Sequence, residues 1–314
     1  MPDDRLKMPP ERDFGFYRRR KHDKWQQIEA PVLEAPIIDT HAHVHMLPDP
    51  GWELVRCAAN GVVGVCEICD PSEDALAPGD ALAAWRDQAA GHLRAAGVPE
   101  EPPAMRFATG VHPHNARLYS EEVEKLLVSR LADPLCAALG EIGLDFHYVL
   151  SPRDVQRRVF RRQLAIAKDR GLPVALHLRG GVDLEADNAH REAFAILEEE
   201  GFPEAGTVLH CCALPPEELR PWVDAGCYIA YGGALTFKNA DAARAGAALV
   251  PDGRLLLETD SPYMAPEPMR GAACTPAHTV FTAARLAEVR ERAPGEQRAA
   301  LLDQTTANAR ALLG

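Results

Sequence analysis

Short apolar segments rich in β-branched residues alternate with longer amphipathic segments, and this alternation limits the possible folds of the chain more than any other feature. Eight such apolar segments follow one another, at 36–43, 61–69, 105–111, 135–144, 173–178, 206–211, 227–231 and 255–258. Nearly continuous apolar strands are typical of a parallel sheet whose faces are both covered. The alternation therefore predicts an α/β protein built as a single (β/α)8 TIM barrel.

The amphipathic segments between the predicted strands carry signals for the ends of helices. Ser151 and Pro152 predict an N-cap and a first-turn proline, and Gly171 predicts the end of the same helix. Similar segments cover residues 80–96, 120–131, 189–200, 216–225 and 276–290. A final amphipathic segment, 296–313, is expected to close or brace the barrel.

Residues 1–36 differ from the rest of the chain in composition. They are rich in proline and charge, and they include a basic run at 18–21 that is followed by Lys24. Because no helical or alternating period occurs there, we expect an extended N-terminal arm with little regular structure, followed by a barrel domain over residues 37–314. The basic run either contacts nucleic acid or is simply a solvated surface.

The overall charge excludes one class of protein. With 34 Lys and Arg against 46 Asp and Glu, the formal net charge is −12, whereas a protein that coats duplex nucleic acid needs a clustered basic surface. No apolar run approaches the roughly 18–20 residues that span a bilayer. We therefore expect a cytoplasmic protein that does not enter a membrane.

Side chains of the kinds that bind metals occur at the ends of five predicted strands. His41 and His43 are two positions apart, so a strand would place both on one side. Glu141 lies inside an apolar strand, where an unpaired carboxylate would cost several kcal/mol, so it is expected to be paired or bound to a metal. The carboxyl ends of barrel strands share one rim. The residues predicted to meet there are His41, His43, Glu141, His177, His210 and Asp260.

This set of six residues favours a metal centre over separate structural roles. A single histidine in such a chain is more often a loop residue or a hydrogen-bonded core residue than a ligand. Four histidines and two carboxylates, however, are what two adjacent divalent ions need if one carboxylate bridges them. Mixed imidazole and carboxylate ligands accept Zn, Mn, Mg or Ni, so we expect two divalent ions of one of these kinds.

Six motifs occur in order within a region that runs from about residue 37 to the closing Asn308-Ala309-Arg310. They are Asp39–His43, Gly110–His114, Gly140–Asp145, His177–Arg179, Thr236–Ala240 and Glu258–Tyr263. In this order they resemble the TatD-related metal-dependent hydrolases of the amidohydrolase superfamily. The chain differs from the usual pattern of that family at 44–45, 211–216 and 274–276, and none of these positions is a predicted ligand.

The resemblance implies a TIM barrel with a two-metal centre that hydrolyses phosphodiesters, typically as a deoxyribonuclease. It implies that one ion is held by His41, His43, Asp260 and a bridging Glu141. It implies that the second ion is held by Glu141, His177 and His210. It also implies that three residues line the substrate cleft, namely His112, Asp145 and Arg179.

The expected reaction is attack by a metal-activated water. Coordination of the zinc type lowers the pKa of water from about 15.7 toward about 7. Asp260 is expected to orient the water and accept its proton, while Arg179 or His112 holds a phosphate oxygen. The acidic net charge favours the ends of single-stranded nucleic acid over duplex as the substrate.

Two other classes of function remain open at this stage. The same metals could hydrolyse a small-molecule ester, amide, lactone or phosphoester, because an activated water attacks carbonyl and phosphoryl centres alike. Alternatively, the barrel could be a binding scaffold without catalysis, which an intact ligand set disfavours. A carboxylated lysine as the bridging group is disfavoured as well, because Glu141 occupies that place.

Overall fold

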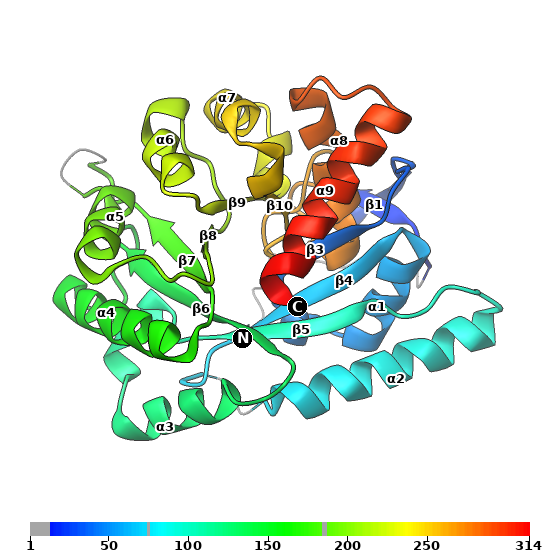
Figure 1. The fold of residues 1–314 in the computed structure, drawn as a ribbon. Coiled ribbons are helices and arrows are strands. Elements are labelled where there is room, and N and C mark those ends of the chain that lie inside the picture. The colour runs from blue at the N-terminus through cyan, green and yellow to red at the C-terminus, as the bar shows by residue number, and fades with distance from the viewer. Residues whose placement is uncertain (1–12, 74–75, 184–186) are drawn as a thin grey trace.

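The computed structural model describes residues 13–73, 76–183 and 187–314, and a ring of eight parallel strands forms its centre (Figure 1). In the sheet order, β10-β9-β8-β7-β6-β5-β4-β3, each strand pairs with its neighbour in the sequence. The strands are β3 (Ile37–Ala42), β4 (Val62–Cys69), β5 (Ala104–Thr109), β6 (Cys136–Asp145), β7 (Val174–Arg179), β8 (Thr207–Leu209), β9 (Tyr228–Tyr231) and β10 (Leu255–Leu257). All eight predicted strands are present, and the predicted TIM-barrel fold is confirmed.

The ring closes between β3 and the residues that follow β10. The Asp260 N–H donates a hydrogen bond to the His41 carbonyl at 2.9 Å, and the His43 N–H donates to the Ser261 carbonyl at 2.8 Å. These bonds lie at the carboxyl ends of both strands. They therefore bring Asp260 beside the two histidines of the first barrel strand.

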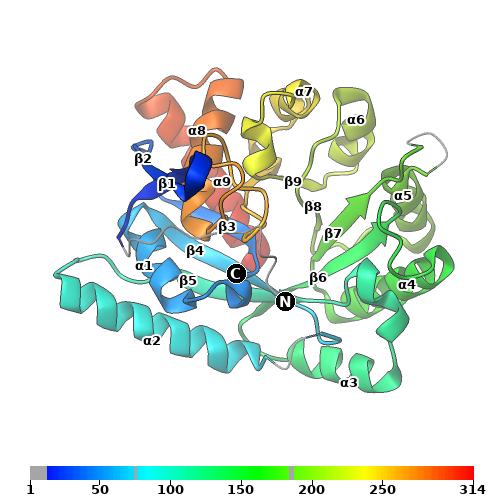
Figure 2. The same ribbon diagram turned by 180° about the vertical axis from the view of Figure 1, so that it is seen from behind.

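Helices surround the ring of strands (Figures 1 and 2). They are α1 (Pro50–Ala59), α2 (Pro78–Ala96), α3 (Glu121–Arg130), α4 (Arg153–Arg170), α5 (Ala189–Glu200), α6 (Pro216–Asp224), α7 (Asp241–Leu249), α8 (Thr279–Val289) and α9 (Glu296–Leu313). Helices α1 and α7 were not predicted. No helix within the described residues is long and apolar enough to cross a membrane.

The start of α4 differs from the prediction. Its N-cap is Pro152, and Ser151 makes no cap hydrogen bond. Instead, the Ser151 hydroxyl donates to the His114 carbonyl at 2.7 Å and accepts from the Arg117 N–H at 2.9 Å, so it holds the loop after β5. The end of α4 agrees with the prediction, because Gly171 follows it in the left-handed conformation with φ of 64°.

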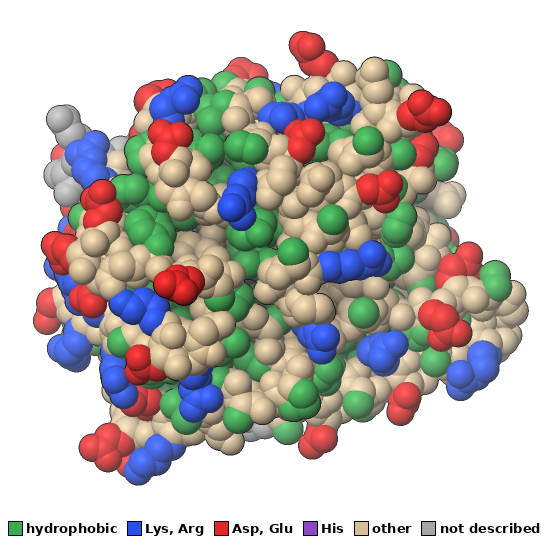
Figure 3. All heavy atoms as spheres, in the orientation of Figure 1, with side chains coloured by type: hydrophobic (Ala, Val, Ile, Leu, Met, Phe, Trp, Pro, Cys, Tyr) green, Lys and Arg blue, Asp and Glu red, His purple; other side chains and the backbone are tan. Residues whose placement is uncertain are grey.

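The last turn of α9 fills the amino-terminal end of the barrel. Leu312 packs with Ala175 and Val208, and Leu313 packs with Ala108 on the inner side of the strands. The C-terminus therefore lies within the ring in Figure 1. In Figure 3 the same face shows acidic and basic side chains intermixed and no histidine. This placement agrees with the expected bracing role of 296–313 and leaves the other end of the barrel for the site.

Residues 13–36 contain a hairpin, which corrects the prediction of an arm with little regular structure. Strand β1 (Phe16–Arg19) pairs antiparallel with β2 (Trp25–Ile28). The buried Phe16 ring packs edge-to-face on Phe281 of α8, with ring centroids 4.9 Å apart. Strands of four residues with one fully buried side chain are too short to produce a detectable period. The remainder of the predicted arm, residues 1–12, lies outside the described residues.

The hairpin packs against a buried histidine just before α8. The ring of His278 lies 5.1 Å from that of Phe16, and its Nδ1 accepts a hydrogen bond from the Thr275 N–H at 3.0 Å. Burial, followed by the charge of Arg56, lowers the pKa of His278 to about 3. This histidine is therefore neutral in the folded protein at every pH above about 4.

We expect His278 to make the fold sensitive to acid. An unfolded histidine has a pKa near 6.5, so between that value and about 3 the unfolded chain binds the extra proton and stability decreases as the pH falls. The variant His278→Gln keeps an acceptor at the same capping position and does not titrate. Between pH 6 and pH 4 the unmodified protein should lose about 2 kcal/mol more unfolding free energy than the variant. Urea unfolding at both pH values measures this, and equal losses would contradict it.

Candidate metal centre

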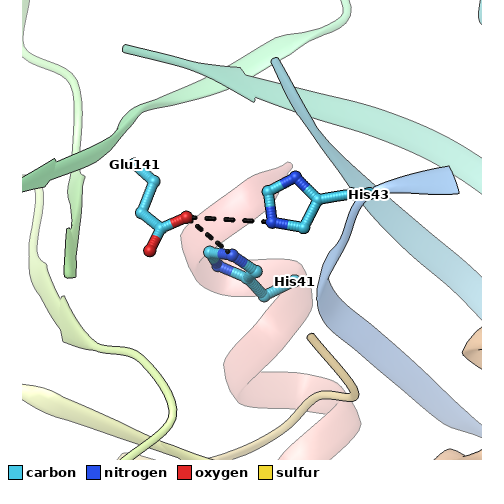
Figure 4. Close-up of side chains that lie close together, drawn as sticks. All are labelled: His41, His43 and Glu141. Carbon is cyan, nitrogen blue, oxygen red and sulfur yellow. Dashed lines mark ion pairs between the residues drawn. The ribbon is translucent and has the colours of Figure 1, made fainter. Parts of the chain in front are cut away.

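All six predicted ligands converge at the carboxyl end of the barrel. His41 and Glu141 come from strands β3 and β6, and both are buried. His43 directly follows β3, and Asp260 lies three residues after the end of β10. The closure of the ring places them side by side. Figure 4 shows His41 and His43 directed toward the same carboxylate. The shared rim expected for these side chains is therefore present.

The Glu141 carboxylate lies between two pairs of histidines. Its Oε2 is 3.3 Å from His41 Nε2 and 3.8 Å from His43 Nε2 (Figure 4). Its Oε1 is 2.5 Å from His177 Nδ1 and 3.1 Å from His210 Nε2. One carboxylate oxygen therefore faces each pair, which is the arrangement that a carboxylate bridging two ions requires.

Asp260 completes the group on the Oε2 side. Its Oδ1 lies 3.5 Å from His43 Nε2 and 3.8 Å from His41 Nε2. Among the residues that the structure describes, ligand atoms within 4.8 Å of one another form four sets: His41, His43 and Glu141; His41, His210 and Asp260; His112, Glu141 and His177; His114, Asp145 and His177. These overlapping sets of nitrogen and oxygen donors could hold more than one divalent ion.

Two observations test whether these residues fit a metal. The Nε2 of His41 is buried and has no hydrogen-bond partner within the described part of the chain, although buried polar atoms are normally bonded. Burial raises the pKa of Glu141, but the charges of His210 and His177 outweigh this effect and hold that pKa well below its ordinary value. An orphaned imidazole nitrogen beside an ionised carboxylate is what a metal ligand set requires.

His112 was expected to contact the substrate, and the structure places it among the possible ligands. Its Nε2 lies 3.6 Å from Glu141 Oε1, and its ring centroid is 4.3 Å from that of His177. Burial, together with the charge of His177, lowers the pKa of His112 to about 4. The imidazole is therefore neutral near pH 7, which is the form that binds a metal.

Asp145, also expected to line the cleft, is fully buried. Its Oδ2 lies 2.7 Å from His114 Nε2 and 3.3 Å from His177 Nε2. Its Oδ1 accepts hydrogen bonds from the N–H groups of His147 and Tyr148 at 2.9 and 2.8 Å. With both oxygens engaged in this way, Asp145 orients the two histidines instead of facing open space.

Arg179, the third expected cleft residue, lies outside the cluster. Its side chain is exposed, and its guanidinium carbon lies 4.7 Å from the centroid of the Tyr148 ring. It ends β7 on the same rim as His177. It is therefore near the group of ligands and accessible from solvent, which suits contact with an anionic substrate.

Two further buried carboxylates support the histidines and were not predicted to do so. Glu258 Oε1 lies 3.4 Å from His210 Nδ1 and accepts a hydrogen bond from the Cys211 N–H at 2.5 Å. Glu67 forms a hydrogen bond with the ring of His45. A carboxylate behind an imidazole determines the orientation and tautomer of the ring. Glu67 lies within the apolar strand β4, and Glu258 directly follows the apolar strand β10. An acidic residue in or next to an apolar strand is the same signal that identified the bridging carboxylate.

This protein is a (β/α)8 barrel, and its histidines and carboxylates converge at the carboxyl ends of the strands. These two features are typical of metal-dependent barrel hydrolases. The family model described as TatD related DNase matches residues 38–314. The chain therefore belongs to the TatD DNase family and is a metal-dependent hydrolase that acts on ester bonds.

Individual relatives agree with this assignment. The uncharacterized metal-dependent hydrolase YabD of Bacillus subtilis is 35% identical over 198 residues, which are 63% of this chain and 74% of YabD. The 3'-5' ssDNA/RNA exonuclease TatD of Escherichia coli is 33% identical over 210 residues, 65% of this chain and 76% of that protein. The crystal structure of YjjV, a TatD homolog of Escherichia coli, matches this fold with a TM-score of 0.70 at 26% identity. The match covers 88% of this chain and 97% of the YjjV chain.

Proposed function

We propose that this hydrolase is a deoxyribonuclease or phosphodiesterase that acts on the ends of single-stranded nucleic acid with two divalent ions. The observation that carries the proposal is the position of Glu141, with one oxygen toward each of two histidine pairs. A paired-metal site is suited to in-line displacement at phosphorus. A relative named as an exonuclease of single-stranded DNA and RNA supports the same substrate class.

The proposal assigns the ligands as two sets that share Glu141. The first set is His41, His43, Asp260 and Glu141, and the second is Glu141, His177 and His210. Ions bound there would lower the pKa of a water and neutralise charge that develops on a phosphoryl oxygen. Zn, Mn, Mg and Ni are the candidates that this donor set accepts. His112 lies close enough to Glu141 to join the second set.

Asp260 is proposed to orient the attacking water and accept its proton. Burial raises the pKa of Asp260, but the hydrogen bond from His43 and the charge of His210 lower it below its ordinary value. The carboxylate is therefore ionised near pH 7, and it lies at the edge of the cluster with 17% of its side chain exposed. Arg179, which is more exposed at the same rim, is proposed to donate to a phosphate oxygen.

Digestion of end-labelled oligonucleotides tests this function. Protein stripped with a chelator should leave single-stranded oligonucleotides intact, and adding back Mn, Zn, Mg or Ni should restore stepwise shortening from one end. Metal analysis of the active protein should give about two equivalents, as a paired site needs. Hydrolysis of small esters or lactones by metal-loaded protein that leaves oligonucleotides uncut would overturn the proposal.

A further inference from the structure

Cationic side chains cluster at the tip of the β1–β2 hairpin, residues 18–24, which we call the basic tip. Its members are Arg18, Arg19, Arg20, Lys21 and Lys24. Arg19, Arg20 and Lys21 line a surface pocket together with Arg270, which belongs to the long loop after β10. A local concentration of positive charge is notable in a chain whose net charge is −12.

The hairpin that carries the basic tip is firmly attached to the barrel. Arg56 of α1 donates a hydrogen bond to the Gly15 carbonyl at 2.8 Å, and its guanidinium carbon lies 5.5 Å from the Phe16 ring centroid. Asn60 donates to the Phe14 carbonyl at 3.1 Å. These contacts hold the base of the hairpin in a defined position, so the tip is presented at one place on the surface.

Within the hairpin, Gln26 orients two of the arginines. Its Oε1 accepts hydrogen bonds from Arg18 Nε at 3.0 Å and from Arg20 Nε at 2.8 Å. An amide carries no net charge, so these bonds position the guanidinium groups without cancelling their charge. Lys21 and Lys24 are exposed beside them. A planar, oriented guanidinium suits bidentate recognition of phosphate.

The basic tip shares a rim with the metal centre. Arg270 lies on the loop after β10 that also carries Asp260, and its guanidinium carbon lies 4.4 Å from the ring centroid of Phe237 after β9. The Glu267 N–H donates to Thr236 Oγ1 at 2.8 Å, which ties the loops after β9 and β10 together. In Figure 2 the dark-blue hairpin lies beside the orange loop after β10. Cations and candidate ligands are therefore carried by connected loops at the same end of the barrel.

We propose that the basic tip and Arg270 form a second phosphate-binding subsite, which holds the backbone of a single-stranded nucleic acid while its end occupies the metal centre. This inference rests on the proposed nuclease function. Contacts of Lys and Arg with phosphates supply affinity without sequence preference. Residues 18–24 precede the 38–314 range that matches the family model, so the hairpin lies outside the part of the chain that the model describes. A nucleic-acid strand is favoured because it carries phosphates both at its end and along its length.

The test compares two triple variants. Arg20→Gln, Lys21→Gln and Lys24→Gln together remove three charges from the basic tip. The matched control removes three exposed charges from helices α2, α3 and α4 through Arg94→Gln, Lys125→Gln and Arg158→Gln. Thermal unfolding verifies that both variants fold. The measurements are kcat and KM for a long single-stranded oligonucleotide and for a dinucleotide, over a range of salt concentrations.

For the tip variant, KM for the long oligonucleotide should rise about tenfold at low salt while kcat is retained. The slope of log KM against log salt should fall by about 2, since each lost contact with a single strand contributes about 0.7. Dinucleotide kinetics should not change, and the control variant should behave like the unmodified protein.

Three results would overturn the subsite, and only the last of them also overturns the proposed function. If the unmodified protein cleaves oligonucleotides and the tip variant matches it in KM and salt slope, the subsite is wrong and the nuclease function stands. The subsite is also wrong, and the nuclease function again stands, if the control variant loses as much affinity as the tip variant. The loss of affinity would then depend on the net charge of the protein and not on the position of the charges. If the unmodified protein hydrolyses a small phosphodiester but no oligonucleotide, the proposed function fails and the subsite fails with it.

Discussion

Replacing Glu141 with glutamine is expected to reduce hydrolysis by at least about a thousandfold, a loss of roughly 4 kcal/mol in transition-state stabilisation. The carboxylate lies within 3.8 Å of His41 and His43 through one oxygen and within 3.1 Å of His177 and His210 through the other. An amide keeps the shape but removes the negative charge that both proposed ions would share. We therefore expect the variant to bind less metal as well as to turn over more slowly.

Metal content and turnover are measured on the same preparations of the Glu141→Gln variant. Glu198→Gln is the matched control, because it makes the same chemical change at an exposed position on α5. Circular dichroism should show the barrel intact in both variants. Full activity with undiminished metal in Glu141→Gln would rule out a bridging role for this carboxylate.

The change Asp260→Asn should lower kcat by about 10²- to 10⁴-fold, the range typical of removing a general base. Asp260 adopts a positive φ of 58°, a conformation that asparagine tolerates well, so the backbone should not change. The amide oxygen can still face the histidines, but an amide does not accept a proton from water. The effect should therefore be on turnover more than on metal content or substrate affinity.

The test of Asp260 depends on separating turnover from metal binding. kcat is measured at saturating metal, with the bound metal quantified in the same sample. Asp87→Asn on α2 is the control, since it is exposed and belongs to a helix on the outside of the ring. If Asp260→Asn retained full turnover with metal bound, another group would have to accept the proton.

The barrel strands could be predicted because their pattern is local. A strand covered on both faces is apolar at nearly every position, as in β4 and β10, and no distant segment alters that pattern. Helices α1 and α7 escaped prediction for equally local reasons. The first begins with Pro50-Gly51, which is typical of a turn. The second has nine residues, mostly alanine and glycine, so few large apolar side chains mark its buried face.

The candidate ligands could be predicted as a group because the fold brings strand ends together. The surrounding carboxylates were harder to place. Glu258 was part of a recognised motif, yet its position behind His210 depends on how β8 and β10 lie relative to each other. Asp145 was expected at the cleft from the family resemblance, but the structure buries it beside His114 and His177. Whether a polar side chain faces solvent or a neighbour depends on packing between segments.

The amino-acid sequence alone was sufficient for the barrel and for the six residues at its rim, since both follow from local periodicity and from the common end that parallel strands share. Only the tertiary structure showed that Glu141 directs one oxygen to each histidine pair, and that the hairpin at 16–28 lies beside Arg270. Those relations join segments distant in the chain. Their distances arise from side-chain packing and barrel closure, which no pattern within a single segment encodes.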